Sequence, residues 1–269
     1  MPKRITTEAE WLACDDPSSM LRRARFRFAR RKSRLFAVAC CRRIWDLLVD
    51  ERSRRAVEVA ELHADGVAND EELGAVAVAA GAAHDEMFQL VGKLGACLEW
   101  AATFVAEANP CHAARSVSWA AATPRAYEIR TPRPEGWYDF DYRPCTVTRR
   151  SVPSALNSGQ WEVRDLEQSM ATGAERPIQA ALIRCVFGNP FRPVSVDPAW
   201  LTPPVVHLAQ AAYEQRTLPE GSLDTTLLTI LADALEEAGC TNADILTHLR
   251  GPGPHVRGCW PIDLILRKK

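Results

Sequence analysis

The sequence has almost no net charge and no long hydrophobic run. Its 269 residues carry 33 Lys and Arg against 34 Asp and Glu, a formal net charge of −1. The longest apolar stretches, such as residues 35–41, are far shorter than a membrane span, and the first residues contain no apolar segment of a signal peptide. We therefore expect a cytoplasmic protein that has no membrane partner.

Familiar catalytic signatures are also missing. The chain contains no G-x-S-x-G, no H-E-x-x-H, no phosphate-binding P-loop and no dinucleotide fingerprint, and its Cys and His residues are too scattered to indicate a catalytic dyad. A convincing repeat of 30–45 residues is absent too, which disfavours a solenoid. These absences favour a non-enzymatic protein. An enzyme with an unfamiliar site near His255 and Cys259 stays open as an alternative.

Cysteine usage argues against a disulfide framework. The nine cysteines are an odd number, and Cys40 and Cys41 are adjacent within a predicted helix, where regular pairing is awkward. We expect most of them to be reduced thiols that pack as small apolar residues.

Apolar periodicity and helix caps predict a mainly α-helical protein. Thr7 and Glu10 form a capping-box pattern before a short helix that Pro17 cannot continue. Residues 33–50 have a broad apolar stripe, and Arg42, Arg43 and Asp46 are assigned to the outer side of this helix. Residues 56–122 contain 20 alanines, which indicates closely packed helices. Asp224 is placed to cap a further helix.

The predicted fold class is an irregular multi-helix bundle with an insertion that could hold a short hairpin. Prolines and aromatic residues alternate in the insertion, a composition typical of an ordered loop. Three regions follow: an N-terminal helical bundle with a basic arm at residues 1–123, the aromatic and Pro-rich insertion at 124–170, and a C-terminal helical subdomain at 171–269.

The near-zero net charge conceals two blocks of opposite sign. Residues 1–60 carry 15 Lys and Arg against 8 Asp and Glu, a net charge of +7, whereas residues 61–123 carry 2 against 9, a net charge of −7. The basic arm holds eight cations and two phenylalanines: Arg22, Arg23, Arg25, Phe26, Arg27, Phe28, Arg30, Arg31, Lys32 and Arg34. Such a run can contact phosphates and stack on bases, or it can pack on the acidic helices of the same chain.

Two thiols and two imidazoles near the C-terminus form the best metal candidate. They are Cys240, His248, His255 and Cys259. These side chains are the ligands of tetrahedral zinc, and Pro252 and Pro254 could fold the second pair back towards the first. The spacings do not form a paired zinc knuckle, so packing without a metal is the alternative, and no other cofactor is expected.

Several blocks of sequence resemble a protein family that occurs in many copies in planctomycete bacteria such as relatives of Gemmata. The matching blocks are TEAEWL (7–12), RLFA to CCRRIW (34–45), DERSRRA (50–56), FGNPFRP (187–193), LADALEEAGC (231–240) and HVRGCW (255–260). The family has no assigned activity, so the resemblance implies a helical core and transfers no site residue. A family of many copies suits recognition or regulation better than housekeeping catalysis.

The sequence therefore predicts a non-enzymatic interaction or regulatory protein. Its contact surfaces would be the basic arm and the aromatic loop, and its partner would be another protein. The alternative is a nucleic-acid-binding accessory protein that uses residues 22–34.

Overall fold

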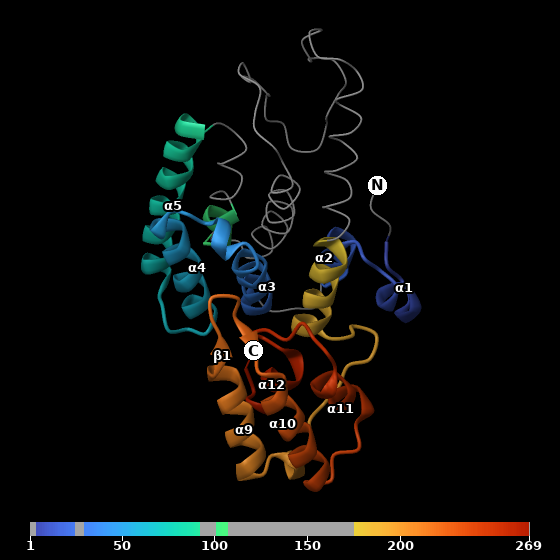
Figure 1. Ribbon diagram of the computed structural model, residues 1–269. Coiled ribbons are helices and arrows are strands. Elements are labelled where there is room, and N and C mark those ends of the chain that lie inside the picture. Colours follow the sequence, from blue (N-terminus) through green and yellow to red (C-terminus); the bar gives the residue numbers. More distant parts are fainter. Residues whose placement is uncertain (1–3, 25–29, 92–100, 107–174, 269) are drawn as a thin grey trace.

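The computed structural model describes residues 4–24, 30–91, 101–106 and 175–268, and this part of the chain is mainly helical (Figure 1). The predicted mainly α fold is confirmed. The hairpin expected in the insertion lies outside the described residues, as does most of the insertion itself. Among the described helices, none combines the length and the apolar character that crossing a bilayer requires.

The described elements of the N-terminal half are all helices. They are α1 (Glu8–Leu12), α2 (Pro17–Ala24), α3 (Arg30–Arg42), the 3₁₀ helix η1 (Trp45–Leu47), α4 (Glu51–Ala64) and α5 (Asp70–Val91), followed by one helical turn at residues 101–105. In Figure 1, α3, α4 and α5 stand side by side, and α4 packs against both of its neighbours.

A helix at residues 175–187 leads into the C-terminal half. The elements after it are η2 (Pro198–Trp200), α9 (Pro203–Glu214), β1 (Arg216–Thr217), β2 (Ser222–Leu223), α10 (Thr225–Glu237), α11 (Ala243–Arg250) and α12 (Trp260–Ile265). The strands form an antiparallel pair in which Arg216 lies opposite Leu223. Helix α10 packs against α9 and α11, and these helices form the lower part of the molecule in Figure 1.

The predicted helix caps are present. Glu10 N donates to Thr7 Oγ1 at 3.2 Å, and Thr7 N donates to the Glu10 carboxylate, which completes the capping box of α1. Pro17 then begins α2, where its missing N–H costs no hydrogen bond. Asp224 accepts from Thr226 N at 2.7 Å and caps α10. Local sequence is sufficient for these boundaries because each cap involves groups within four residues.

One continuous hydrophobic core contains residues from both ends of the chain. Trp11 and Phe36 from the N-terminal half share it with Leu182, Leu231 and Ile262, and all five side chains are buried. Apolar contacts therefore connect α1 and α3 to the C-terminal helices through residues 175–187.

The sequence-based position of Arg42 is wrong. We expected Arg42 on the outer side of its helix, but its side chain is only 5% exposed. Arg42 Nη2 donates to Glu61 Oε2 of α4 at 2.7 Å, and its Nη1 donates to the Pro219 carbonyl at 2.8 Å. Arg216 Nη2 donates to Glu61 Oε2, also at 2.7 Å. A pattern of apolar residues classes arginine as polar, whereas a carboxylate from another helix offsets the cost of burying the guanidinium.

Glu61 provides a test of this buried cluster. Burial opposes its ionisation, but the guanidiniums of Arg216 and Arg42 outweigh that effect and hold the pKa of Glu61 below its usual value. Because the folded-state pKa is depressed, the stabilisation is present above the ordinary glutamate pKa of 4.5 and is lost as the pH falls through the folded value. We expect Glu61→Gln to lower the free energy of unfolding at pH 7 by about 3 kcal/mol.

Denaturant unfolding at pH 7 and at pH 3.5 measures this effect. The difference between wild type and Glu61→Gln should shrink at the lower pH. Glu58→Gln is the matched control, since Glu58 lies on the same helix in an exposed pair with Arg55 and should change little. Equal losses for the two variants would contradict the assignment.

Candidate metal centre

Four side chains with metal-binding atoms meet in the C-terminal half of the protein. The Sγ atoms of Cys185 and Cys259 and one ring nitrogen each of His248 and His255 lie within 4.8 Å of one another. Cys185, His255 and Cys259 are buried, and His248 is partly exposed. They form the one such group of three or more candidate ligands in the described part of the chain.

The four side chains come from three separate pieces of structure. Cys185 is in the last turn of the helix at 175–187, His248 is in the last turn of α11, and Cys259 is the residue before the first turn of α12. His255 lies in the loop between α11 and α12. The helix at 175–187 and α11 each contribute a residue of the last turn, and these two helix ends lie close to a common point.

The loop after α11 brings His255 and Cys259 back towards His248. Gly251 ends α11, and the chain reverses over the following glycine and prolines. Gly253 has a φ of +87°, and a Cβ there would lie 2.9 Å from the backbone nitrogen of His255. Glycine is therefore required at this position both by its left-handed backbone and by the close approach of the chain.

The ring of His255 is oriented with one nitrogen towards the group. Its Nε2 is 3.0 Å from the Gly251 carbonyl, which can only accept, so Nε2 carries the proton and donates. In the neutral ring Nδ1 then carries the lone pair, and it is buried without a hydrogen-bond partner. A second hydrogen bond that fixes the tautomer is the usual arrangement for a histidine that binds a metal.

His248 approaches the same point from α11. Its Nε2 is 3.3 Å from Cys259 Sγ. This is the distance of a hydrogen bond, and it is also close to the separation of about 3.5 Å between nitrogen and sulfur in a tetrahedral zinc site. The His248 ring meets the His255 ring edge-on at a centroid distance of 5.0 Å, and the Trp260 ring lies 5.5 Å away on another side.

The two thiols affect each other's ionisation. Cys259 and the neighbouring imidazoles lower the pKa of Cys185 despite its burial, whereas burial and Cys185 raise the pKa of Cys259. The neighbouring Cys185 also raises the pKa of His255 against the effect of burial. The site thus favours a thiolate at Cys185, and the thiolate is the form of cysteine that binds a metal.

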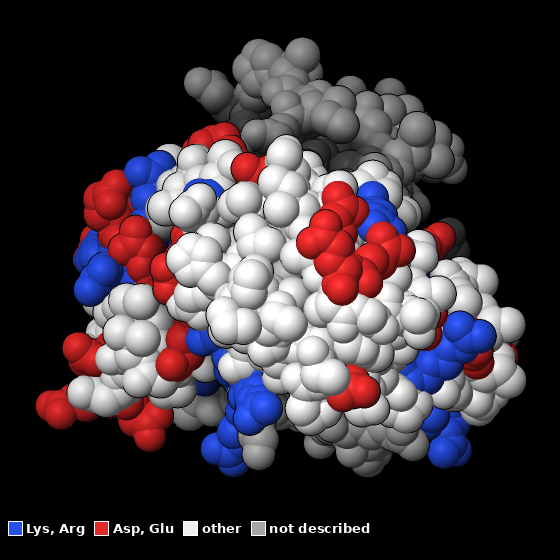
Figure 2. Space-filling model, turned by 90° about the horizontal axis from the view of Figure 1, so that it is seen from below, with Lys and Arg blue, Asp and Glu red and all other residues white. Residues whose placement is uncertain are grey.

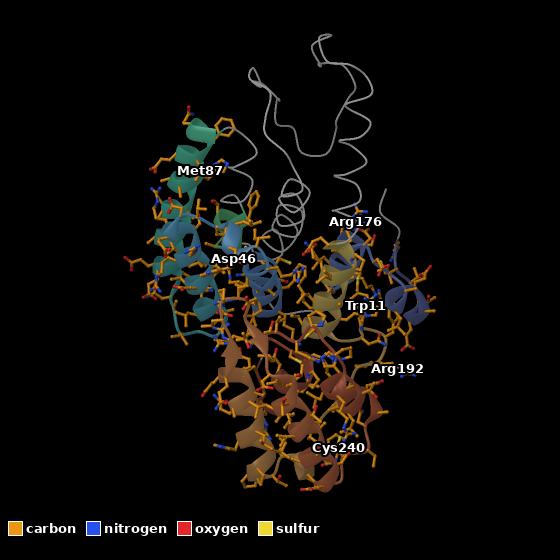
Figure 3. The ribbon with its side chains drawn as sticks, in the orientation of Figure 1. Trp11, Asp46, Met87, Arg176, Arg192 and Cys240 are labelled. Atoms are coloured by element: carbon orange, nitrogen blue, oxygen red, sulfur yellow. The ribbon has the colours of Figure 1, made fainter. Side chains whose placement is uncertain are left out.

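Three of the four predicted ligands are together, and the fourth differs. His248, His255 and Cys259 belong to the group, but Cys185 stands where we placed Cys240. Cys240 is buried just after α10, and Figure 3 shows it at the lower end of the C-terminal helices, away from the end of the yellow helix that carries Cys185. Spacing could not identify Cys185, because it lies far earlier in the sequence and in an ordinary apolar stripe.

The described part of the basic arm contacts other residues of the protein. Arg31 pairs with Asp65 and Asp263, Arg34 Nη1 donates to the Val105 carbonyl at 2.7 Å, and the Arg23 guanidinium lies 4.6 Å from the centre of the Phe191 ring. Arg25, Phe26, Arg27 and Phe28 lie outside the described residues, Arg22 is half-buried, Arg30 is exposed, and Lys32 is half-buried.

Figure 2 shows the molecule from below: much of the middle of this face is uncharged, a cluster of Asp and Glu lies right of the centre, and Lys and Arg gather at the lower middle, the right and the left. Binding of a protein or a nucleic acid through the arm stays a prediction.

Comparison with known proteins gives no match for this chain. No protein-family profile, curated protein or solved structure matches the chain. The resemblance to the planctomycete family stays a prediction.

Proposed function

We propose that this is a zinc-binding protein in which Cys185, His248, His255 and Cys259 hold one structural zinc ion. The observation that supports the proposal is the convergence of two thiols and two imidazoles within 4.8 Å, with Nδ1 of His255 buried and unpartnered beside them. An unpartnered buried nitrogen is unfavourable unless something binds it, and a metal ion would do so.

The donor set favours zinc over other metals. Thiolate and imidazole are the ligands of tetrahedral Zn²⁺ sites with two Cys and two His, whereas Mg²⁺ and Ca²⁺ prefer oxygen. The hydrogen bond from His255 Nε2 to the Gly251 carbonyl leaves Nδ1 as the ring nitrogen available to a metal ion. The residues present therefore fit a zinc ion.

The same arrangement favours a structural role over a catalytic one. Catalytic zinc normally has three protein ligands and keeps one position for water or substrate, whereas here four protein ligands would complete the tetrahedron. Three of the four are buried, and the Trp260 ring lies beside His248. A closed site of this kind is consistent with the non-enzymatic role that the sequence predicts.

A zinc ion here would join segments that are far apart in the sequence. Cys185 belongs to the helix that follows the insertion, while the other three ligands lie within residues 248–259. One ion would fix the end of that helix to α11 and to the start of α12. Closing such a long loop limits the freedom of the unfolded chain, and metal binding adds directly to folding stability.

Metal analysis of the purified protein tests the proposal. We expect about one zinc ion per chain in wild type and close to none in Cys259→Ser or Cys185→Ser, because loss of one thiolate leaves an incomplete tetrahedron. Cys240→Ser is the matched control: it replaces a buried cysteine of the same half of the protein and should keep the full zinc content. Wild-type protein without zinc would overturn the proposal. Loss of zinc from Cys240→Ser alone would show that Cys240, and not Cys185, is the ligand.

Zinc removal should also lower the thermal stability. With zinc at a thousandfold excess over its dissociation constant, binding stabilises the folded state by about 4 kcal/mol, which corresponds to roughly 10 °C in the melting temperature of a protein of this size. Calorimetry before and after chelation measures the shift, and added zinc should reverse it. Cys259→Ser should melt at the same temperature with and without chelator, and a chelator effect in that variant would point to another site.

A further inference from the structure

The C-terminal ligands lie in a segment that also receives side chains from α3. Residues 255–263 contain His255 and Cys259, and the same segment ends with the buried carboxylate of Asp263. A Cβ on Gly258 would lie 2.8 Å from Cδ1 of Leu35, so α3 is in close contact with the residue just before Cys259. The metal centre and α3 therefore share one short piece of chain.

Arg31 of α3 makes the strongest of these contacts. Its Nη1 donates to Asp263 Oδ2 at 2.7 Å, its Nε to Asp65 Oδ1 at 3.0 Å and its Nη2 to the Tyr213 hydroxyl at 2.7 Å. The side chains of Arg31, Asp65 and Asp263 are only 9%, 6% and 2% exposed. A buried arginine with three side-chain partners can hold three elements in one relative position.

Lys32 contacts the other side of the metal centre. Its Nζ donates to the carbonyl of Val186 at 2.9 Å, directly after Cys185, and lies 3.9 Å from Asp263 Oδ2. Adjacent residues of α3 thus contact both of the segments that a zinc ion would join. These contacts place α3 next to Cys185 on one side and next to α12 on the other.

One helical turn connects Asp263 to the proposed ligand Cys259. Asp263 N donates to the Cys259 carbonyl at 3.0 Å, across the first turn of α12. A movement of the Cys259 backbone therefore moves the Asp263 carboxylate, which is the partner of Arg31.

We propose that Arg31 and Lys32 are positioning residues of the zinc centre, so that zinc binding and the docking of α3 strengthen each other. The proposal rests on the proposed zinc site. Neither residue is a ligand: Arg31 holds α12 through Asp263, and Lys32 holds the end of the helix at 175–187 through the Val186 carbonyl. Coupling of this kind is reciprocal, because a zinc ion that favours the docked arrangement must itself bind more tightly when α3 is docked.

The sign of the effect of Arg31→Met separates positioning from simple electrostatics. Removing a positive charge near the site would by itself strengthen the binding of Zn²⁺. If Arg31 positions the ligands, the same substitution weakens binding, and supporting residues around metal sites typically change affinity by 10–100-fold. We expect Arg31→Met to weaken zinc binding by at least about tenfold, because the guanidinium that holds Asp263 of α12 is lost.

A competition titration with a chromophoric zinc chelator measures this affinity in the full chain. Arg52→Met is the matched control, because Arg52 also bridges two carboxylates, Asp50 and Glu86, but does so on the exposed side of α4. Cobalt in place of zinc reports ligand geometry, and its thiolate absorption should persist in Arg31→Met at higher cobalt concentration. An unchanged or tightened zinc affinity in Arg31→Met would overturn the proposal.

Hydrogen–deuterium exchange of wild-type protein tests the coupling without a substitution. On zinc removal, exchange should rise in α11, in residues 251–268 and in the first turns of α3, and one equivalent of zinc should restore protection. Unchanged exchange in α3, or a uniform rise that includes α5, would overturn the coupling while leaving the zinc site intact. If wild type binds no zinc at all, the proposed function itself fails, so the two failures are distinguishable.

Discussion

The arrangement of the helices depends on the burial of charged side chains of α3 with matched partners. Arg31 and Arg42 enter the interior from this helix and find Asp65, Asp263 and Glu61 there. An unpaired charge in the same position would be strongly unfavourable, so each pair requires that its two elements stay in register. The apolar core stabilises the fold in general, whereas these pairs select one relative position of α3, α4 and α12.

The proposed zinc centre would extend the same principle to the C-terminal half. Two imidazoles and two thiols converge there in a largely buried site. A metal ion would satisfy them together and would hold three segments at one point. Because residues 255–263 contain two of the candidate ligands as well as Asp263, the ionic cluster and the proposed metal centre are parts of one connected arrangement.

Much of the local structure could be predicted from the sequence. The mainly helical fold, the capping box of Thr7 and Glu10, and the cap at Asp224 all depend on neighbouring residues, and all are confirmed. Three candidate ligands were found for a similar reason, since His248, His255 and Cys259 lie close together in the chain. Cys185 was missed because nothing in its local pattern distinguishes it from a core cysteine.

The sequence by itself determined where helices begin and end, and which residue types were available for a metal or an ion pair. Only the tertiary structure decided which of them meet. Arg42 is buried because Glu61 lies opposite, and Cys185 rather than Cys240 joins the histidines because the helix at 175–187 ends beside α12. The physical reason is the range of the interactions: caps and periodicity act over a few residues, whereas charge pairing and ligand convergence depend on distances in the folded chain.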